Sequence, residues 1–420
     1  MNRGLLAVVV TTAFLTMLDN TVVTVAAPSI ARDLGAPLPA LEWVATAYML
    51  TYAGLLLAGG RLADRFGDRR VLLAGLAVFT AASLAAGLSR QITVLITARG
   101  VQGVGAALLV PATLAVVAGC EERDRLRCAA AWTASGAVAL AAGPVAGGLL
   151  SQHLHWSWIF LVNVPAGLAA LVVGGRAAGG ARRRPATRPG LPGLFARRAY
   201  RGSIAVQVLW GLGVTGVYFH TSVFLQDVRG FRPVPAGLAF LLVAAAVAAG
   251  APAATPLVLR FGAARPVAAG LVLVAAGIGV VAAASTSTAV LLAALTVIGF
   301  GSALTVPLAA VALAAVPPDR AGLGSGVFAV AREVSGVLGI AGIGLVVTAA
   351  GGLARGYPPG LAAAAALVLA GAAIAARTLP GGDAEGAHQR RPGGVQLPLP
   401  VRPGVRAVEV QVDGGGDPGP

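Results

Sequence analysis

Long apolar stretches with very little charge recur through the whole of this 420-residue chain. A run of about 17 to 25 apolar residues can cross the hydrocarbon of a bilayer as a helix. A transmembrane β-barrel would instead show alternating segments of about ten residues. The sequence therefore predicts an all-α, polytopic membrane protein. Its twelve predicted spans are Leu5–Ala27, Trp43–Gly59, Val71–Leu88, Thr93–Ala118, Ala129–Leu150, Ile159–Gly175, Ser203–Leu225, Ala236–Leu259, Val267–Ala284, Ala289–Val316, Gly322–Ala350 and Gly360–Ala376.

The composition agrees with a membrane protein and argues against a nucleic-acid-binding one. Charged residues make up 11% of the chain, against about 25% in soluble domains, and the mean hydropathy is +0.83. The net charge of +15 could suggest a nucleic-acid partner, but almost all basic residues stand between the spans, where membrane topology uses them. All 31 basic residues are arginine, and Ala, Gly, Val and Pro are abundant. That bias indicates a bacterium with a GC-rich genome.

Arginine is distributed very unequally between the two sides of the predicted membrane. One side carries 24 of the 31 arginines, the other side carries five, and Arg99 and Arg332 lie inside spans. The positive-inside rule then places the arginine-rich side, with both termini, in the cytoplasm of a multi-pass cell-membrane protein. The first apolar run has no small-residue cleavage site after it, so we expect it to remain as the first span.

The chain divides into two sets of six spans. We expect an N-terminal half over residues 1–175, an Arg- and Pro-rich cytoplasmic linker over 176–202, a C-terminal half over 203–378 and a disordered cytoplasmic tail over 379–420. The segment LRFGAAR (Leu259–Arg265) is a weak echo of LADRFGDRR, and both fall between a second and a third span of their half. The echo suggests a parallel repeat about an axis along the membrane normal.

The most highly charged connection between spans is Gly59–Arg70, with the sequence GGRLADRFGDRR. Gly60 and Gly67 permit the unusual backbone angles or close approach that a short reversal needs. The spacing G-x-x-x-D-R-x-G-x-R-R is more specific than a run of charge, although a simple basic loop is the alternative. The charged residues of this segment are Arg61, Asp64, Arg65, Asp68, Arg69 and Arg70.

Two charged residues inside the N-terminal spans are candidates for proton and substrate binding. Asp19, followed by Asn20, stands in the middle of the first span, and Arg99 lies early in the fourth span with Gln102 on the same helical face. Charge at membrane depth is costly and usually faces a cavity or a partner. We expect Asp19 to be a protonatable or cation-facing carboxylate in a central cavity. The alternatives are an acid satisfied by neighbouring helices and an acid nearer the outer membrane interface. Arg99 would pair with a carboxylate or the substrate, or extend to the membrane interface.

Small residues line one side of the fifth span, in GAVALAAGPVAGGLL. Gly136, Gly143, Gly147 and Gly148 are spaced so that they share roughly one face, and Pro144 can bend the helix. Such a face permits close helix–helix contact, although small residues are common in membrane helices generally.

The eleventh span contains adjacent opposite charges, Arg332 and Glu333. Neighbouring side chains on a helix point about 100° apart, so we expect the two to have separate partners. Glu333 is a second candidate proton site. Glu42, Asp227 and Asp319 stand at span edges, where we expect solvated loop carboxylates.

The sequence shows no motif for an enzyme, a nucleotide or a metal. It has no H-E-x-x-H, no G-x-x-x-x-G-K-[ST] and no C-x-x-C, so no cofactor is expected and a proton gradient would supply the energy. Cys120 and Cys128 flank a loop on the predicted cytoplasmic side, where a disulfide is not expected. His153 and His155 could bind a metal, but a solvated loop is the favoured interpretation.

Taken together, these stretches resemble the major facilitator superfamily, and within it the drug:proton antiporters of the fourteen-helix family. The resemblance covers roughly Leu5–Arg377. It rests on LDNTVVTVAAPSIARDLG in the first span, GGRLADRFGDRR in the loop, Arg99, Gln102 and Gly103 in the fourth span, GPVAGGLL followed by WSWIFLVNVP, and FLQDVRGFRPVPAGLAFL and PPDRAGLGSGVFAVAREVSG in the second half. Two departures are Asp68, where the loop motif usually has a basic residue, and twelve spans in place of fourteen.

The resemblance implies proton-coupled export of hydrophobic or cationic small molecules by alternating access. The binding site would lie near the midplane between the halves. Asp19 would bind the proton or cation, and Arg99 would modulate the pKa of a carboxylate. The charged loop would hold the cytoplasmic side closed in one state, and the glycine face would let the fifth span pack closely. The partners expected are the substrate, protons and the lipid bilayer, and we expect a monomer.

Two other functions stay open at this point. The first is a carrier of the same fold for one metabolite or natural product. The sparse charge within the spans argues against a strongly anionic cargo. The second is a membrane receptor or scaffold that does not transport, against which the intact loop and glycine motifs count.

Overall fold

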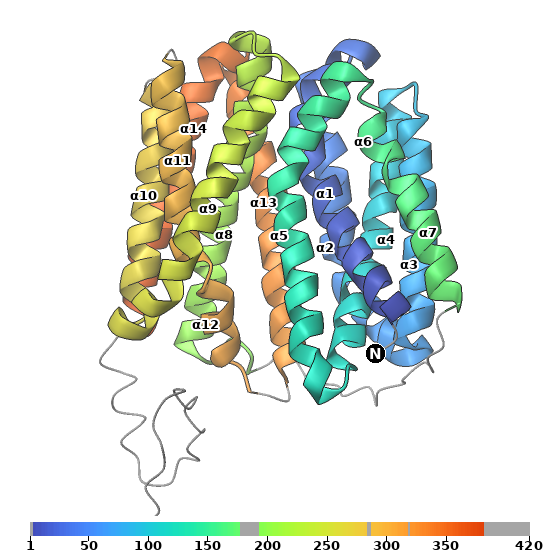
Figure 1. Ribbon diagram of the computed structural model, residues 1–420. Helices are drawn as coiled ribbons and strands as arrows, with labels where there is room; N and C mark the ends of the chain where they lie inside the picture. Colours follow the sequence, from blue (N-terminus) through green and yellow to red (C-terminus); the bar gives the residue numbers. More distant parts are fainter. Residues whose placement is uncertain (1–2, 177–192, 284–286, 318–319, 382–420) are drawn as a thin grey trace, which may run out of the picture.

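The described part of the chain is helical apart from connecting turns and one isolated β-bridge between Gly262 and Gly381 (Figure 1). The computed structural model describes residues 3–176, 193–283, 287–317 and 320–381. Within these residues, twelve helical segments of 19 to 31 residues are long and apolar enough to cross a membrane, which confirms the predicted number of spans and the all-α class. Most of the predicted linker, almost all of the predicted tail and Asp319 lie outside the described residues.

Each half of the chain supplies six of the twelve spans, and three of the spans consist of two consecutive elements. The pairs are α6 with α7, α8 with the π-helical turn η1, and α11 with α12. The helices of the first half are α1 (Arg3–Leu34), α2 (Leu38–Phe66), α3 (Asp68–Gly87), α4 (Ile92–Ala118), α5 (Glu122–His153), α6 (Trp158–Leu161) and α7 (Asn163–Arg176). Those of the second half are α8 (Arg198–Val223), η1 (Phe224–Val228), α9 (Pro233–Phe261), α10 (Ala264–Ala283), α11 (Thr288–Thr305), α12 (Leu308–Ala314), α13 (Ala321–Ala349) and α14 (Leu353–Thr378).

The buried apolar side chains form two large clusters. One is built mainly from residues between Val8 and Ala170, and the other from residues between Val206 and Leu379. Figure 1 accordingly shows α1 to α7 gathered beside α8 to α14, with α5 and α9 adjacent where the two groups meet. Each half therefore has its own packed interior, and contacts between the halves are a separate set.

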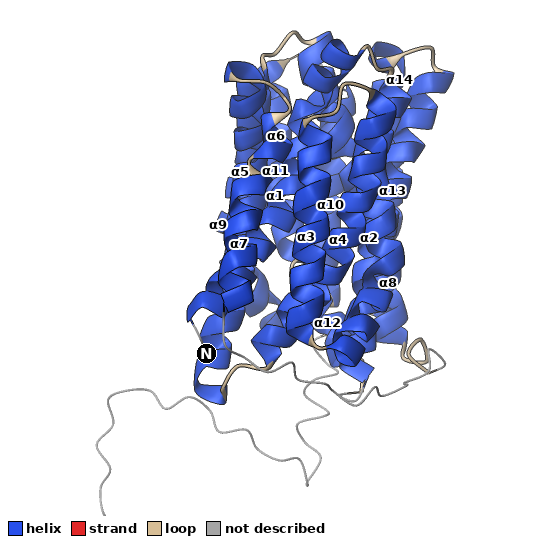
Figure 2. Cartoon of the chain, turned by 90° about the vertical axis from the view of Figure 1, so that its right-hand side faces the viewer, coloured by secondary structure: helices blue, strands red, loops and turns tan. Residues whose placement is uncertain are grey.

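The helical bundle has two ends, which we name by the elements that lie there. We call the end at which α1 begins, and at which Gly67 joins α2 to α3, the basic end. The opposite end, at which α1 is joined to α2, is called the distal end, and both side views show the start of α1 far from it (Figure 2). The positive-inside rule predicts that the basic end faces the cytoplasm.

The most extensive contacts between the halves are those of α2 with α13 and of α5 with α9. A Cβ atom on Gly148 would lie 2.6 Å from the carbonyl oxygen of Pro233, and one on Gly237 would lie 2.3 Å from that of Pro144. The α5 and α9 backbones therefore approach each other directly near the distal end, which only residues without a side chain allow.

The helices extend beyond the apolar runs, which corrects the expected loop at Gly59–Arg70. Helix α2 continues to Phe66 and α3 begins at Asp68, so Gly67, with φ of 93°, is the one residue between them. Apolar length marks the hydrocarbon thickness only, whereas Arg, Asp and Leu are compatible with a helix that continues into the headgroup region. Gly60 therefore lies within α2 and makes no turn. The close approach falls on Gly59, whose Cβ would lie 2.0 Å from the carbonyl oxygen of Ala107.

Candidate functional site

The centre of the N-terminal half holds a buried ion pair between α1 and α4. The guanidinium of Arg99 donates through Nη1 to Asp19 Oδ2, and the exposed fractions of the two side chains are 1% and 0%. Arg99 also donates through Nε to the Val44 carbonyl oxygen at 3.0 Å and through Nη1 to Gln102 Oε1 at 2.7 Å. A buried ion pair is tolerated only when further hydrogen bonds satisfy both charges, and this pair meets that condition.

Two amide side chains complete the coordination of the Asp19 carboxylate. Gln102 donates to Oδ1 at 2.7 Å and Asn163, the first residue of α7, donates to the same oxygen at 3.1 Å. Gln102 also donates to Ser83 Oγ of α3 at 2.9 Å, so side chains of α1, α3, α4 and α7 join in one hydrogen-bonded network. We call Asp19, Arg99, Gln102, Asn163 and Ser83 the Asp19 network. Its five side chains are at most 1% exposed.

The local sequence explains why these groups meet. Arg99 and Gln102 are three residues apart on α4 and therefore share a face. Gly103 lets α2 come close on the adjoining side, because a Cβ there would lie 2.2 Å from Thr51 Oγ1. The Arg99 guanidinium then lies over the ring of Tyr48, 4.5 Å from its centroid, where the ring face attracts a cation.

The expectation that Asp19 faces a central cavity is wrong for this conformation. Asp19 is fully buried among helices of its own half, and its neighbours satisfy the carboxylate. The reason is that the Arg99 side chain extends from α4 to α1 and pairs with Asp19. The sequence predicted that Arg99 pairs with a carboxylate, but not which one. Asn20 is partly exposed, about 100° around the helix from Asp19.

The charged pair on α13 also differs from expectation. Arg332 donates through Nε and Nη2 to Oε1 of Glu333, at 3.0 and 2.7 Å, so the two residues partner each other. The arginine side chain is long enough to curve back along the helix, which the 100° separation of the Cβ atoms does not prevent. Glu333 is buried, whereas the Arg332 side chain is 43% exposed in the middle of a membrane-spanning helix.

Arg69, in the charged turn Gly59–Arg70, contacts a helix of its own half in this conformation. Arg69 donates to the carbonyl oxygens of Gly174 and Gly175, at 3.1 and 2.7 Å. These carbonyls belong to the last turn of α7, where helix carbonyls lack partners within the helix. Arg69 therefore caps α7 from α3. Of the other residues of the turn, Arg65, Arg70 and Arg61 are exposed and Asp64 is half-buried.

Replacing Arg69 with glutamine is expected to lower the stability of the folded protein by about 1.5–3 kcal/mol, because hydrogen bonds to a charged donor are lost at α7. The melting temperature of the purified protein in detergent measures this. Arg70→Gln is the matched control, because Arg70 is the next residue along the chain and its side chain is exposed. This substitution should change the melting temperature little. Equal effects of the two substitutions would contradict the capping role.

The glycine face of α5 is divided between two neighbours. Gly143 and Gly147 pack on α1, where a Cβ would lie 1.9 Å from Thr21 Oγ1 and 2.6 Å from the Val22 carbonyl oxygen respectively. Gly148 instead packs on α9 of the other half. Gly136 has only an ordinary contact, 3.6 Å to Met17 Cγ. Helix α5 therefore connects the α1 segment next to Asp19 with the opposite half.

The distal end carries polar contacts between the halves. Arg32 pairs with Asp227 at 3.2 Å, both being partly exposed, and Gln226 donates to the Val25 carbonyl oxygen at 2.9 Å. The backbone N–H of Val234 donates to Gln152 Oε1 at 3.1 Å. These contacts join α1 and α5 to η1 and α9.

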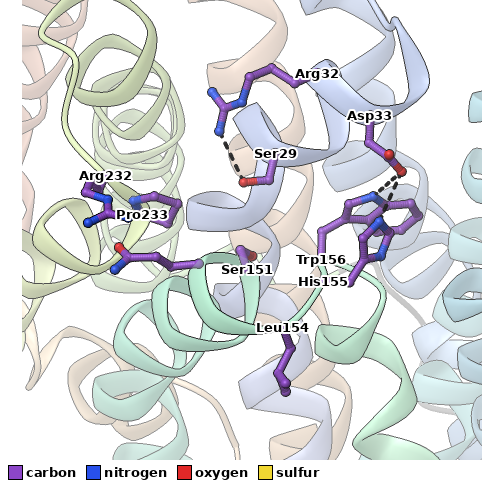
Figure 3. A pocket seen from close by; sticks show the side chains of 10 residues that line it. Ser29, Arg32, Asp33, Ser151, Leu154, His155, Trp156, Arg232 and Pro233 are labelled. Carbon is purple, nitrogen blue, oxygen red and sulfur yellow. Dashed lines mark hydrogen bonds and ion pairs between the residues drawn. The ribbon is translucent and has the colours of Figure 1, made fainter.

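A pocket of about 510 Å³ opens among these distal contacts (Figure 3). The Asp33 carboxylate accepts a hydrogen bond from Trp156 Nε1 at 2.7 Å and lies 3.3 Å from His155 Nε2. The residues that line the pocket are Ser29, Arg32, Asp33, Ser151, Gln152, Leu154, His155, Trp156, Arg232 and Pro233. His155 is thus paired with a carboxylate of its own half.

Sequence reasoning missed Asn163, Ser83 and His220, and it misassigned Glu42. Asn163 and Ser83 gave no signal beyond being polar within a span, because small polar residues are common in membrane helices. Glu42 was expected to be a solvated loop carboxylate, which is wrong, since its side chain is 13% exposed and lies 3.2 Å from the fully buried His220. An ionisable His220 inside the seventh apolar run was the available signal.

Comparison with known proteins gives a family and a fold. Residues 9–340 match the family model described as Major Facilitator Superfamily. The chain is 32% identical over 413 residues to the Multidrug resistance protein Stp of Mycobacterium tuberculosis (strain CDC 1551 / Oshkosh), covering 83% of this chain and 77% of that one. It is 31% identical to the Puromycin resistance protein pur8 of Streptomyces alboniger, with 82% of each covered. Among solved structures, a D-xylose-proton symporter aligns with a TM-score of 0.75 at 12% identity, over 90% of this chain and 98% of that chain.

Proposed function

This chain belongs to the major facilitator superfamily, and we propose that within it the protein is a proton-coupled exporter of hydrophobic or cationic small molecules. It is a membrane transporter and not an enzyme. The energy would come from the proton gradient, without a cofactor. We also propose that the protein works as a monomer in the cell membrane of a GC-rich bacterium, with the basic end and both termini in the cytoplasm.

The observation that carries this proposal is the buried pair of Asp19 and Arg99. A carboxylate beside a guanidinium favours its charged form, whereas a carboxylate that loses the guanidinium in an apolar bundle takes up a proton. A small movement of α4 relative to α1 would therefore exchange an ion pair for a protonated acid. That exchange is the property required of a residue that couples proton movement to a change in shape.

The packing of α5 supports a route from Asp19 to the opposite half. Thr21 and Val22 follow Asp19 on α1 and contact Gly143 and Gly147 of α5. One residue further along α5, Gly148 contacts α9. A displacement of α1 at Asp19 would thus reach the contact between the halves through the Val22 carbonyl, Gly147, Gly148 and the Pro233 carbonyl, which are backbone groups or glycines.

Substrate-driven proton movement in inverted membrane vesicles tests the proposal. Vesicles loaded with a pH-sensitive dye are given a proton gradient and then a panel of lipophilic cations. Dissipation of the gradient on addition of a cation, absent from vesicles without the protein, is the expected result. The absence of any response, from protein shown to be folded, would contradict the proposal.

A carrier with one natural product as its cargo is the second candidate. The half-exposed Arg332 guanidinium on α13 favours it, because Nη1, which does not contact Glu333, can donate to an acidic group on a substrate. One of the relatives is named for resistance to a single compound, puromycin. Arg332→Gln would then weaken transport of acidic compounds and leave that of lipophilic cations unchanged.

A further inference from the structure

The contact between Glu42 and His220 is much more buried than another charged contact between the two halves, that of Arg32 with Asp227. Glu42 lies in the second turn of α2 and His220 near the end of α8, both at the distal end. The exposed fractions of their side chains are 13% and 0%. Nothing in the proposed transport cycle so far uses these two residues.

The hydrogen-bond partners of His220 fix where its protons are. Nδ1 lies 2.9 Å from the carbonyl oxygen of Gly216, which can only accept, so Nδ1 must carry a hydrogen. Nε2 lies 3.2 Å from Glu42 Oε1. That second contact also needs one hydrogen, held either as an imidazolium facing a carboxylate or as a carboxylic acid facing a neutral imidazole. In both forms the pair is electrically neutral.

Removing this shared proton makes the same contact unfavourable. A lone pair on Nε2 would then face the lone pairs of a carboxylate, and the site would hold an uncompensated negative charge away from water. Helix α13 tightens the constraint, because a Cβ on Gly344 would lie 2.0 Å from Glu42 Oε1. The carboxylate is thus enclosed between α2, α8 and α13.

We infer that Glu42 and His220 form a proton-binding site that bridges the two halves and keeps the distal end closed while one proton is shared between them. Loss of the proton opens the distal end, and uptake of a proton from the distal side closes it. Proton uptake from the distal side is the direction that an inwardly directed proton gradient drives, if the distal end faces outward. The inference rests on the proposed alternation of access, but not on the cargo or on Asp19.

Several other titratable groups at the distal end and on α13 have contacts of their own. Arg32 pairs with Asp227, Asp33 lies beside His155, and the hydroxyl of Tyr357 is 2.7 Å from Thr221 Oγ1. Arg355 of α14 is exposed, and on α13 Arg332 and Glu333 pair with each other. In the part of the chain that the structure describes, Glu42 is the charged partner of His220.

Electron paramagnetic resonance distances between the halves test this inference. Spin labels are placed at Leu88 and Ser287, which are exposed at the distal ends of α3 and α11, in a background where the buried Cys120 and Cys128 are replaced by alanine. The full chain is measured in lipid nanodiscs between pH 5.5 and 8.5. For the release of one proton, the ratio of long to short distances should rise by up to about tenfold per pH unit.

Two variants and a matched control separate this site from other titrating groups. His220→Gln keeps a donor for Glu42 but cannot titrate, so the ratio should change less than twofold per pH unit. Glu42→Gln should also lose the pH dependence. His155→Gln removes another histidine–carboxylate pair at the same end, but one within a single half, and should keep the full pH dependence.

The outcomes distinguish this inference from the proposed function. An unchanged slope in both His220→Gln and Glu42→Gln, or a slope abolished by His155→Gln, overturns the inference. If the ratio of long to short distances does not change with pH in the labelled chain that keeps Glu42 and His220, while protons still move in vesicles, the inference is overturned and the proposed function is not. A normal pH slope without proton movement in vesicles overturns the proposed coupling and supports the proton-binding site.

Discussion

Asp19→Asn is expected to abolish substrate-driven proton movement and to lower the stability of the folded protein by about 3–5 kcal/mol. Asparagine keeps nearly the same shape and can still accept from Gln102 or Asn163, but it leaves the Arg99 guanidinium buried without a counter-charge. Proton movement is measured in the vesicle assay, and stability as the melting temperature of the purified protein in detergent.

The double variant Asp19→Asn/Arg99→Gln separates coupling from folding. Removing both charges of a buried pair is often close to neutral for stability, whereas removing one is costly. The double variant should therefore recover most of the lost melting temperature and still fail to move protons. Proton movement that persists in the folded double variant would exclude Asp19 from the coupling path and direct attention to Glu333.

Gly148→Val is expected to reduce transport by at least about tenfold while leaving each half folded. Its side chain would meet the backbone carbonyl of Pro233 across the junction of the halves. Overpacking of this kind costs about 1–3 kcal/mol, and here the cost falls on the state in which the distal end is closed. The ratio of closed to open molecules would fall by about 5- to 150-fold, since each 1.4 kcal/mol is tenfold.

Gly136→Val is the control for this prediction. Gly136 lies on the same helix, and its Cβ would have only an ordinary contact with Met17. Transport rates and the distances between labels at Leu88 and Ser287 should change in Gly148→Val and stay nearly constant in Gly136→Val. Equal losses in both variants would mean that α5 tolerates no added volume anywhere, and that the contact with α9 has no special role.

The spans were predictable because one physical quantity, the thickness of the hydrocarbon layer, sets the length of an apolar run. The ends of the helices were not, since charged side chains are compatible with a helix outside the hydrocarbon. This is why the segment Gly59–Arg70 was expected to be a loop, although only Gly67 lies outside a helix there. Likewise, the glycine at which α2 approaches another helix most closely is Gly59 and not Gly60, because the approach depends on where the backbone of α4 lies and not on the turn.

The candidate site was predictable in its charges and not in its pairings. Asp19 and Arg99 stood out because ionisable groups in spans are costly, but the sequence does not say which helices are neighbours. The pairing of Arg332 with Glu333 was missed for a different reason, because side-chain flexibility outweighed the helical angle. The Glu42–His220 contact was missed because Glu42 stands near the end of its span, where a sequence suggests exposure to solvent. In the structure α8 of the other half covers it.

The Asp19–Arg99 pair also has a consequence for how the chain enters the membrane during synthesis. Eighty residues separate the two charges along the chain, which at about 5–20 residues per second corresponds to a delay of about 4 to 16 s. Helix α1 must therefore cross, or wait beside, the lipid with an unpaired acid, at a cost of about 2.5–3.5 kcal/mol on the insertion scale. The long apolar remainder of α1 offsets this cost until α4 arrives and neutralises the charge.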